Sequence, residues 1–387
     1  MSTRTHSLED PAAEASQFLI RLGLGVLAIA MPVSGLYFRR SVFLLFPIGA
    51  GVILVGALLA PRRDSLGRLR DALLSPMGVV ALVLLGWAAA SILWTPFRSD
   101  ALERLFKVGG TLGLAAAAAA LLPDRTRVAN LYLAPVGVAL AAVMGAATAT
   151  IGAQAGWRFV PDPATLERAL IGISVVMWPA LAVLIARGRV GLSVTLPILV
   201  AATAFVSGSA LAFLSLAAGG LAFAAALGSQ QVATRWLGRV FATLVILAPA
   251  AALAVGALAS RAKGAFAGHL AAMEQWANLI RTDPARLLTG RGLDAAGQGA
   301  AQGGVPAGAP RTAIFDIWHE LGVVGAVATA ALLYGAFRTA RRAPPEAGPA
   351  LVCGLTHGLI VGALGGVSAQ IAWLTTIATS AILFTAM

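Results

Sequence analysis

The stretch VFLLFPIGAGVILVGALLA, residues 42–60, contains no charged side chain. As an α-helix it would be about 28 Å long, close to the roughly 30 Å hydrocarbon core of a bilayer. Apolar runs of similar length recur along the chain, in which 59% of residues are hydrophobic and only 11% are charged. The pattern predicts an all-α, polytopic membrane protein with about 12 transmembrane helices, near residues 18–34, 42–60, 77–95, 108–122, 131–152, 169–186, 192–207, 209–228, 240–259, 313–337, 350–366 and 369–386.

The spacing of these runs bounds the domain organisation. No gap between them is long enough for a soluble domain, so residues 1–387 are predicted to form a single membrane domain. Residues 1–17 lack the basic start and short apolar run of a signal peptide, so we expect the first span to direct insertion. The single cysteine, Cys353, lies in an apolar run, which argues against disulfides and cysteine-ligated metals.

The distribution of positive charge predicts the orientation. With the N-terminus in the cytoplasm, 14 arginines lie on the cytoplasmic side and 7 Arg or Lys residues lie in short loops on the other side. This asymmetry favours both termini inside, and the inverted topology is the alternative. A further 6 cations lie in the long outer segment 260–312, so the outer side carries almost as many as the inner side. Such a surplus indicates an anionic ligand outside.

Segment 260–312 is the longest connection between spans. In residues 268–280, GHLAAMEQWANLI, the apolar residues Leu270, Met273, Trp276 and Ile280 recur at helical spacing, which predicts a helix on the membrane surface. Residues 290–311, GRGLDAAGQGAAQGGVPAGAPR, are rich in Gly, Ala and Pro and predict a mobile loop. The loop is either a substrate gate beside a membrane cavity or a plain connector.

Two other outer segments carry paired or isolated cations. After the loop 94–100, Asp100 and Arg104 can pair at i,i+4 on a helix, and so can Glu103 and Lys107, which by itself would explain those cations. Arg158 and Arg168 stand at the mouth of the span that follows. They either bind an anion or extend toward the interface while their stems lie in lipid.

A series of short motifs runs through residues 90–330: Leu93-Trp94-Thr95-Pro96, Arg168 with Trp178-Pro179, Ser207-Gly208-Ser209-Ala210, Trp276, Pro284, Gly290-Arg291-Gly292-Leu293-Asp294, and Ala313-Ile314-Phe315-Asp316-Ile317-Trp318-His319-Glu320-Leu321-Gly322-Val323-Val324-Gly325. In this order the motifs resemble those of the O-antigen ligase and O-antigen polymerase superfamily. Several positions depart from the family pattern. Arg311 and Thr312 stand where the family has histidine and asparagine, and Ala272 and Gly208 stand where it has arginines.

The resemblance implies a GT-C-like bundle in the bacterial inner membrane with one long periplasmic loop, 260–312. It implies a metal-independent, inverting glycosyltransferase that moves a glycan from undecaprenyl pyrophosphate to a hydroxyl acceptor. The acceptor is the lipid A core for a ligase of lipopolysaccharide biosynthesis, or a growing glycan for an O-antigen or exopolysaccharide polymerase. A flippase or exporter of lipid-linked glycans and a non-catalytic binder are the alternatives. No nucleotide-binding or metal-binding motif occurs in the sequence, so we expect no cofactor and no nucleic-acid partner, only these substrates and membrane lipids.

The candidate site residues follow from the motifs and from the demands of the chemistry. Arginine suits a pyrophosphate because its guanidinium remains charged and can bind phosphate oxygens through two hydrogen bonds. The substrate-binding candidates are Arg168, Arg158, Arg286, Arg291, Gly290 and Gly292, whereas Arg39 and Arg261 lie outside the motifs and are expected to matter less. The catalytic candidates are Arg311, Asp316 and His269.

The general base is the least determined role, because arginine does not deprotonate in proteins. In a span that begins near Thr312, Asp316 would lie about 6 Å and Glu320 about 12 Å below the surface. Asp316 can therefore face a cavity mouth, whereas Glu320 is too deep. Asp316, His319 and Glu320 also share a helix face, so a polar cluster that holds the bundle together is the alternative.

The charge asymmetry makes a direct prediction. In a Cys353→Ser background, an impermeant thiol reagent applied to intact cells should label Ala300→Cys and leave Pro345→Cys unlabelled, because the two positions lie on opposite sides. Labelling of position 345 alone would reverse the orientation.

Overall fold

The computed structural model describes residues 11–59, 65–122, 128–152, 160–257, 267–365 and 371–387. All regular elements in these ranges are helical, as predicted. In chain order they are α1 (Pro11–Gly25), η1 (Val26–Ala30), α2 (Met31–Gly35), α3 (Ser41–Leu59), α4 (Ser65–Leu74), α5 (Pro76–Ser91), α6 (Arg98–Leu121), α7 (Val128–Leu131), α8 (Leu133–Ala147), η2 (Thr148–Gly152), α9 (Pro163–Ala186), α10 (Val190–Val206), α11 (Ala210–Gly256), α12 (Ala267–Thr282), α13 (Arg286–Thr289), α14 (Ala295–Ala301), α15 (Ala313–Ala340), α16 (Gly348–Leu364) and α17 (Ile371–Thr385).

Each predicted apolar segment overlaps a helix, but the helices differ in length. Within the described ranges, seven helices are long and apolar enough to cross a membrane. The pair α4 and α5, bent by 70° at its break, would make eight, and α10, α16 and α17 are shorter apolar helices. The structure therefore supports an all-helical, polytopic membrane protein. The number of about 12 spans remains a prediction.

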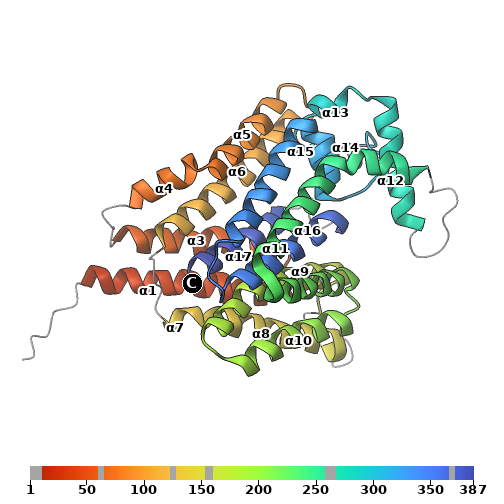
Figure 1. The fold of residues 1–387 in the computed structure, drawn as a ribbon. Coiled ribbons are helices and arrows are strands. Elements are labelled where there is room, and N and C mark those ends of the chain that lie inside the picture. The colour runs from red at the N-terminus through yellow and green to blue at the C-terminus, as the bar shows by residue number, and fades with distance from the viewer. Residues whose placement is uncertain (1–10, 60–64, 123–127, 153–159, 258–266, 366–370) are drawn as a thin grey trace, which may run out of the picture.

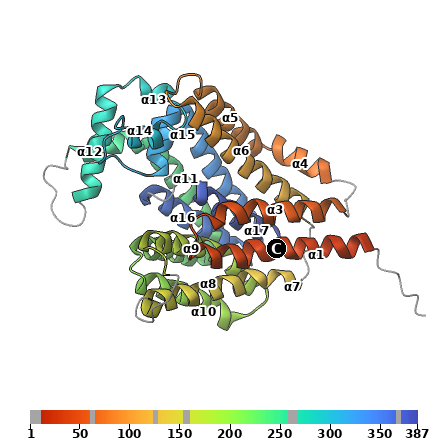
Figure 2. The ribbon, with the colours of Figure 1, turned by 180° about the vertical axis from the view of Figure 1, so that it is seen from behind.

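The helices form two groups that run in different directions, as both views of the ribbon show (Figures 1 and 2). In the first group, α9 packs against α8, α10 and α17 and contacts α2, and most of its apolar residues are buried in one large cluster. The second group contains α5, α6, α11 and α15, with α12 to α14 at one end (Figure 1). Helix α16 packs against α11 and α9 and joins the groups.

Helix α15 is broken at Gly322, where φ is 62°. The carbonyls before the break are satisfied from other segments: Arg291 N donates to His319 O at 2.8 Å, and Gly292 N donates to Glu320 O at 3.0 Å. Trp87 Nε1 of α5 donates to Leu321 O at 2.9 Å. Because buried backbone groups require partners, the Gly-Arg-Gly motif acts here as a cap for a broken helix.

A proline in α11 creates a similar requirement. Pro249 has no N–H, so the carbonyl of Val245, four residues earlier, loses its helical partner. The indole Nε1 of Trp318 in α15 donates to this carbonyl at 2.8 Å. The tryptophan of the family-like motif therefore ties α15 to α11.

The long segment differs from its prediction. Helix α12 forms as expected, but Trp276 and Ile280 of its apolar face are buried in a cluster with α11 and α15. The Gly-Ala-Pro stretch, predicted as a mobile loop, contains α14 and packs Ala296, Val305 and Ala309 into the same cluster. Small side chains permit this close approach, so a composition typical of loops also fits tight packing.

The break at Gly322 should be sensitive to a side chain. A Cβ there would lie 2.6 Å from Leu288 O and would have to adopt positive φ. Gly322→Ala should therefore lower the unfolding free energy by about 2 kcal/mol or more in detergent. Gly220→Ala in α11, where a Cβ meets no atom within 4 Å, is the matched control. Equal midpoints for the two variants would contradict the strained geometry.

Candidate functional site

A polar cavity of about 370 Å³ lies between the start of α6, the segment around α14 and the start of α15. We call it the polar cavity. Its lining carries four basic and four acidic side chains and comes from outer segments that the charge count assigns to one side of the membrane. The lining residues are Arg39, Phe43, Asp100, Glu103, Arg104, Lys107, Asp294, Ala296, Gly297, Gln298, Arg311 and Asp316.

Arg104 is the central cation of this cavity. One terminal nitrogen lies 2.9 Å from Asp294 Oδ1 and 2.7 Å from Glu320 Oε1. The predicted pairing of Arg104 with Asp100 is therefore wrong, because half-buried Asp294 of the long segment and buried Glu320 of α15 pair with it instead. The predicted pairing of Glu103 with Lys107 is confirmed.

The two carboxylates of α15 differ in their partners. Glu320, 3% exposed, accepts from Arg104 and, at 3.3 Å, from Ala296 N, and it does not line the cavity. Asp316, 7% exposed, lines the cavity together with Arg311, and its carboxylate has no hydrogen-bond partner among the described residues. The expected difference in accessibility between Asp316 and Glu320 is thus observed.

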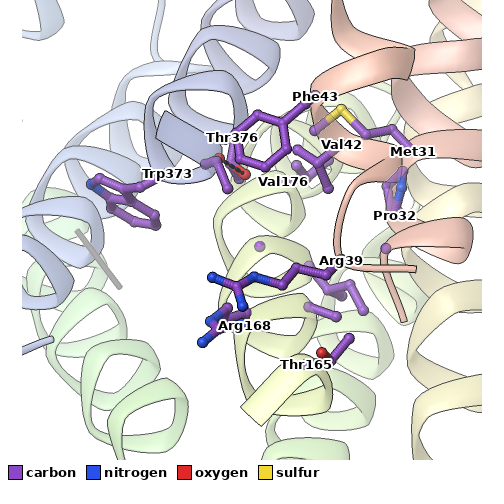
Figure 3. Close-up of a pocket in the computed structure, with 15 residues that line it drawn as sticks. Met31, Pro32, Arg39, Val42, Phe43, Thr165, Arg168, Val176, Trp373 and Thr376 are labelled. Atoms are coloured by element: carbon purple, nitrogen blue, oxygen red, sulfur yellow. Dashed lines mark hydrogen bonds between the residues drawn. The ribbon is translucent and has the colours of Figure 1, made fainter. Parts of the chain in front are cut away.

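A second, mostly apolar cavity of about 60 Å³ adjoins the first, and we call it the apolar cavity. Arg39 and Phe43 line both cavities. Figure 3 shows the guanidinium groups of Arg39 and Arg168 extending into the apolar cavity, with Trp373 nearby and Phe43 among the apolar residues above them. Neither arginine forms an ion pair with a described carboxylate, although the charge of Arg168 acts on the Asp162 carboxyl at the start of α9.

The entry to α9 fixes Arg168 in place. Asp162 is the N-cap of α9 and accepts from Thr165 N at 2.9 Å and from Thr165 Oγ1 at 2.6 Å. These hydrogen bonds hold the pKa of the Asp162 carboxyl below its usual range. The charged cap begins the helix that carries Arg168 two turns later.

The remaining substrate-binding candidates lie elsewhere or have other partners. Arg286 and Arg291 line a small cavity of about 30 Å³ with His319, and each lies 3.6 Å from Asp283 Oδ2, which offsets their charge. Gly290 and Gly292 have positive φ and pack directly against the backbone of α15 and of the residues after α5. They serve the close packing of the loop, and they line neither the polar nor the apolar cavity.

Two further candidates are not brought to either cavity. His269 is exposed on α12 and lines neither of them. Arg158 lies outside the described residues, as does Arg261. The described residues contain no group of three or more His, Cys, Asp or Glu side chains that could hold a metal ion.

Three residues of the site were missed or misplaced by the sequence patterns: Arg39, Arg104 and Asp294. Arg39 stands outside every motif, yet it lines both cavities. Asp294 ends the Gly-Arg-Gly-Leu-Asp motif and has φ of 66°, so it turns toward Arg104. The only signal for Arg39 was its predicted outer position.

Comparison with known proteins adds no relative. No family model, curated protein or solved structure matches this chain. The resemblance to the O-antigen ligase and polymerase superfamily therefore rests on the motifs themselves.

The contacts of Arg104 lead to a stability prediction. Arg104→Ala would leave Glu320 buried without its cation, which should cost about 3 kcal/mol of unfolding free energy. Lys107→Ala, one turn along α6, breaks only the exposed pair with Glu103 and should cost less than about 1 kcal/mol. Chemical denaturation in detergent compares the two variants. Similar losses would mean that the buried ion pairs do not hold α6 to α15.

Proposed function

We propose that this protein is a glycosyltransferase that moves a glycan from a polyprenyl pyrophosphate to a hydroxyl acceptor at the outer face of the bacterial inner membrane. The single observation that carries the proposal is the position of Arg39, which lines both a cavity with apolar walls and a cavity with polar walls. A lipid-linked sugar has the same division, with an apolar chain, an anionic centre and a polar glycan.

The pyrophosphate would lie at the junction of the two cavities. Arg39 and Arg168 both line the apolar cavity, and neither forms an ion pair with a described carboxylate. Two guanidinium groups can bind the charge that develops on the leaving phosphate oxygen. The volume of about 60 Å³ admits only the part of the lipid nearest the phosphate, so the rest of the chain would lie in the membrane.

The glycan and its acceptor would occupy the polar cavity. Its volume of about 370 Å³ is within the range of small-molecule sites. The acceptor hydroxyl oxygen would attack the anomeric carbon as the bond from that carbon to the pyrophosphate oxygen breaks. Asp316 would accept the hydroxyl proton, because it is the buried carboxylate that lines the cavity without a hydrogen-bond partner among the described residues.

Arg311 contributes positive charge to this arrangement. It lines the polar cavity with Asp316, at the position where the family has histidine. As a permanent cation it can bind the glycan or the departing pyrophosphate, and it cannot take the proton. In this arrangement Asp316 would accept the proton and Arg311 would supply the positive charge.

The missing histidine also favours one alternative, a non-catalytic protein that binds a lipid-linked glycan. A flippase would need the same cations, and a polymerase would differ from a ligase only in its acceptor. The measured product distinguishes a transferase from a flippase. Release of polyprenyl pyrophosphate when acceptor is added indicates transfer, whereas movement of the intact donor across the bilayer indicates a flippase.

The test measures binding and transfer of a labelled lipid-linked glycan by the full chain in proteoliposomes. Asp316→Asn should lower transfer at least about 100-fold, because a general base contributes that much, and should leave donor binding unchanged. Arg39→Ala and Arg168→Ala should each weaken donor binding about tenfold, the loss expected for one charge-assisted contact.

Arg281→Ala is the matched control for the arginine variants. Arg281 is exposed on α12, pairs with Asn278 and lines neither cavity. Equal small effects of all three arginine changes would indicate diffuse attraction to lipid. A normal rate and pH profile for Asp316→Asn would remove Asp316 as the base, and donor binding without release under any acceptor would support the non-catalytic alternative.

A further inference from the structure

A cationic cavity lies at the opposite end of α15 from the polar cavity. Its volume is about 240 Å³. Five arginines line it: Arg235 and Arg239 from α11, and Arg338, Arg341 and Arg342 from the end of α15 and the turn that follows. Thr234, Tyr334 and Phe337 complete its lining. We call it the arginine cavity.

No carboxylate balances this cluster within the described part of the chain. The lining contains no acidic residue, and none of the five arginines forms an ion pair with a described carboxylate. The polar cavity, by contrast, has equal numbers of acidic and basic side chains. All five arginines are exposed, so water and salt screen their mutual repulsion, and an anion bound among them would relieve what remains.

Ordinary helix electrostatics accounts for only part of the cluster. The C-terminal end of a helix carries a partial negative charge, which suits Arg338 and Arg341 at the end of α15. Arg235 and Arg239 have no such explanation, because α11 is broken at Ser229 and they follow the start of its second half. The usual excess of Arg and Lys on the cytoplasmic side explains the number of arginines. It does not explain why those of α11 and α15 line the same cavity.

The position along α15 places this cavity at a membrane surface. An unbroken helix from Asp316 to Arg338 would rise about 33 Å, close to the thickness of the hydrocarbon core, and α15 covers this stretch with one break at Gly322. Tyr334 lines the cavity, and Trp236, the chain neighbour of Arg235 in α11, is 61% exposed; exposed Tyr and Trp are typical of a bilayer interface. Met77, at the start of α5, contacts Gly335 and Thr339 of α15, so the bend between amphipathic α4 and α5 lies at this end of α15.

We infer that the arginine cavity binds the headgroup of an anionic phospholipid that carries two phosphates. Each guanidinium can bind a phosphate through parallel hydrogen bonds, and basic pockets between membrane helices at the cytoplasmic surface suit such headgroups. Five cations carry more positive charge than one phosphodiester neutralises, which favours the doubly charged headgroup of a diphosphatidylglycerol over singly charged phosphatidylglycerol. The exposed face of Tyr334 would lie against the lipid chains.

The experiment uses the purified full chain in detergent and requires no glycan. Native mass spectrometry and thermal unfolding compare binding of diphosphatidylglycerol, phosphatidylglycerol and inorganic pyrophosphate. Diphosphatidylglycerol should raise the unfolding temperature and bind at least tenfold more tightly than phosphatidylglycerol. The double variant Arg235→Gln, Arg239→Gln should lose at least tenfold in that affinity.

Arg187→Gln with Arg189→Gln is the matched control, since it removes two cations between α9 and α10 on the same predicted side, away from the cavity. A second variant, Arg338→Gln with Arg342→Gln, approaches the cavity from α15 and tests it if the first does not fold. Equal losses in the cavity and control variants would overturn the inference in favour of diffuse charge. Binding of pyrophosphate without binding of diphosphatidylglycerol would overturn it in favour of a soluble ligand.

Discussion

Arg104 holds together three segments that are far apart in the chain, and the candidate site depends on it. Its guanidinium, in α6, contacts Asp294 in the long segment and Glu320 in α15, which are 190 and 216 residues away. In a buried setting such charges are costly alone and favourable only in mutual contact. The contact therefore requires that the long segment fold back over the start of α15, where its Gly-Arg-Gly backbone also caps the carbonyls before Gly322.

This requirement sets which charges remain for a ligand. Asp294 and Glu320 neutralise Arg104, and Asp283 offsets Arg286 and Arg291. Asp316 lacks such a contact among the described residues, and so does Arg39, which reaches the apolar cavity beside Arg168. The charges without ion pairs are therefore the ones available for phosphate binding and for proton transfer, whatever the total number of arginines.

The two ends of α15 differ in the charges that surround them. At its start, acidic and basic side chains mix around a cavity, which suits a ligand with both hydroxyl and phosphate groups. At its end, arginines gather without acids, which suits a ligand that is purely anionic. Helix α15 lines both cavities and packs on α5, α11 and α16 between them.

The sequence by itself determined the helical, membrane-type architecture, because apolar run length and charge spacing act locally and each run can be read alone. It also predicted the helix of residues 267–282 and the difference between Asp316 and Glu320, which follow from rise per residue. Only the tertiary structure decided the partner of Arg104, the capping role of Gly290 and Gly292, the ordered packing near Ala296 and the place of Arg39 between two cavities. These depend on contacts between segments far apart in the chain, and helical periodicity fixes which face a residue occupies but not which distant face it meets.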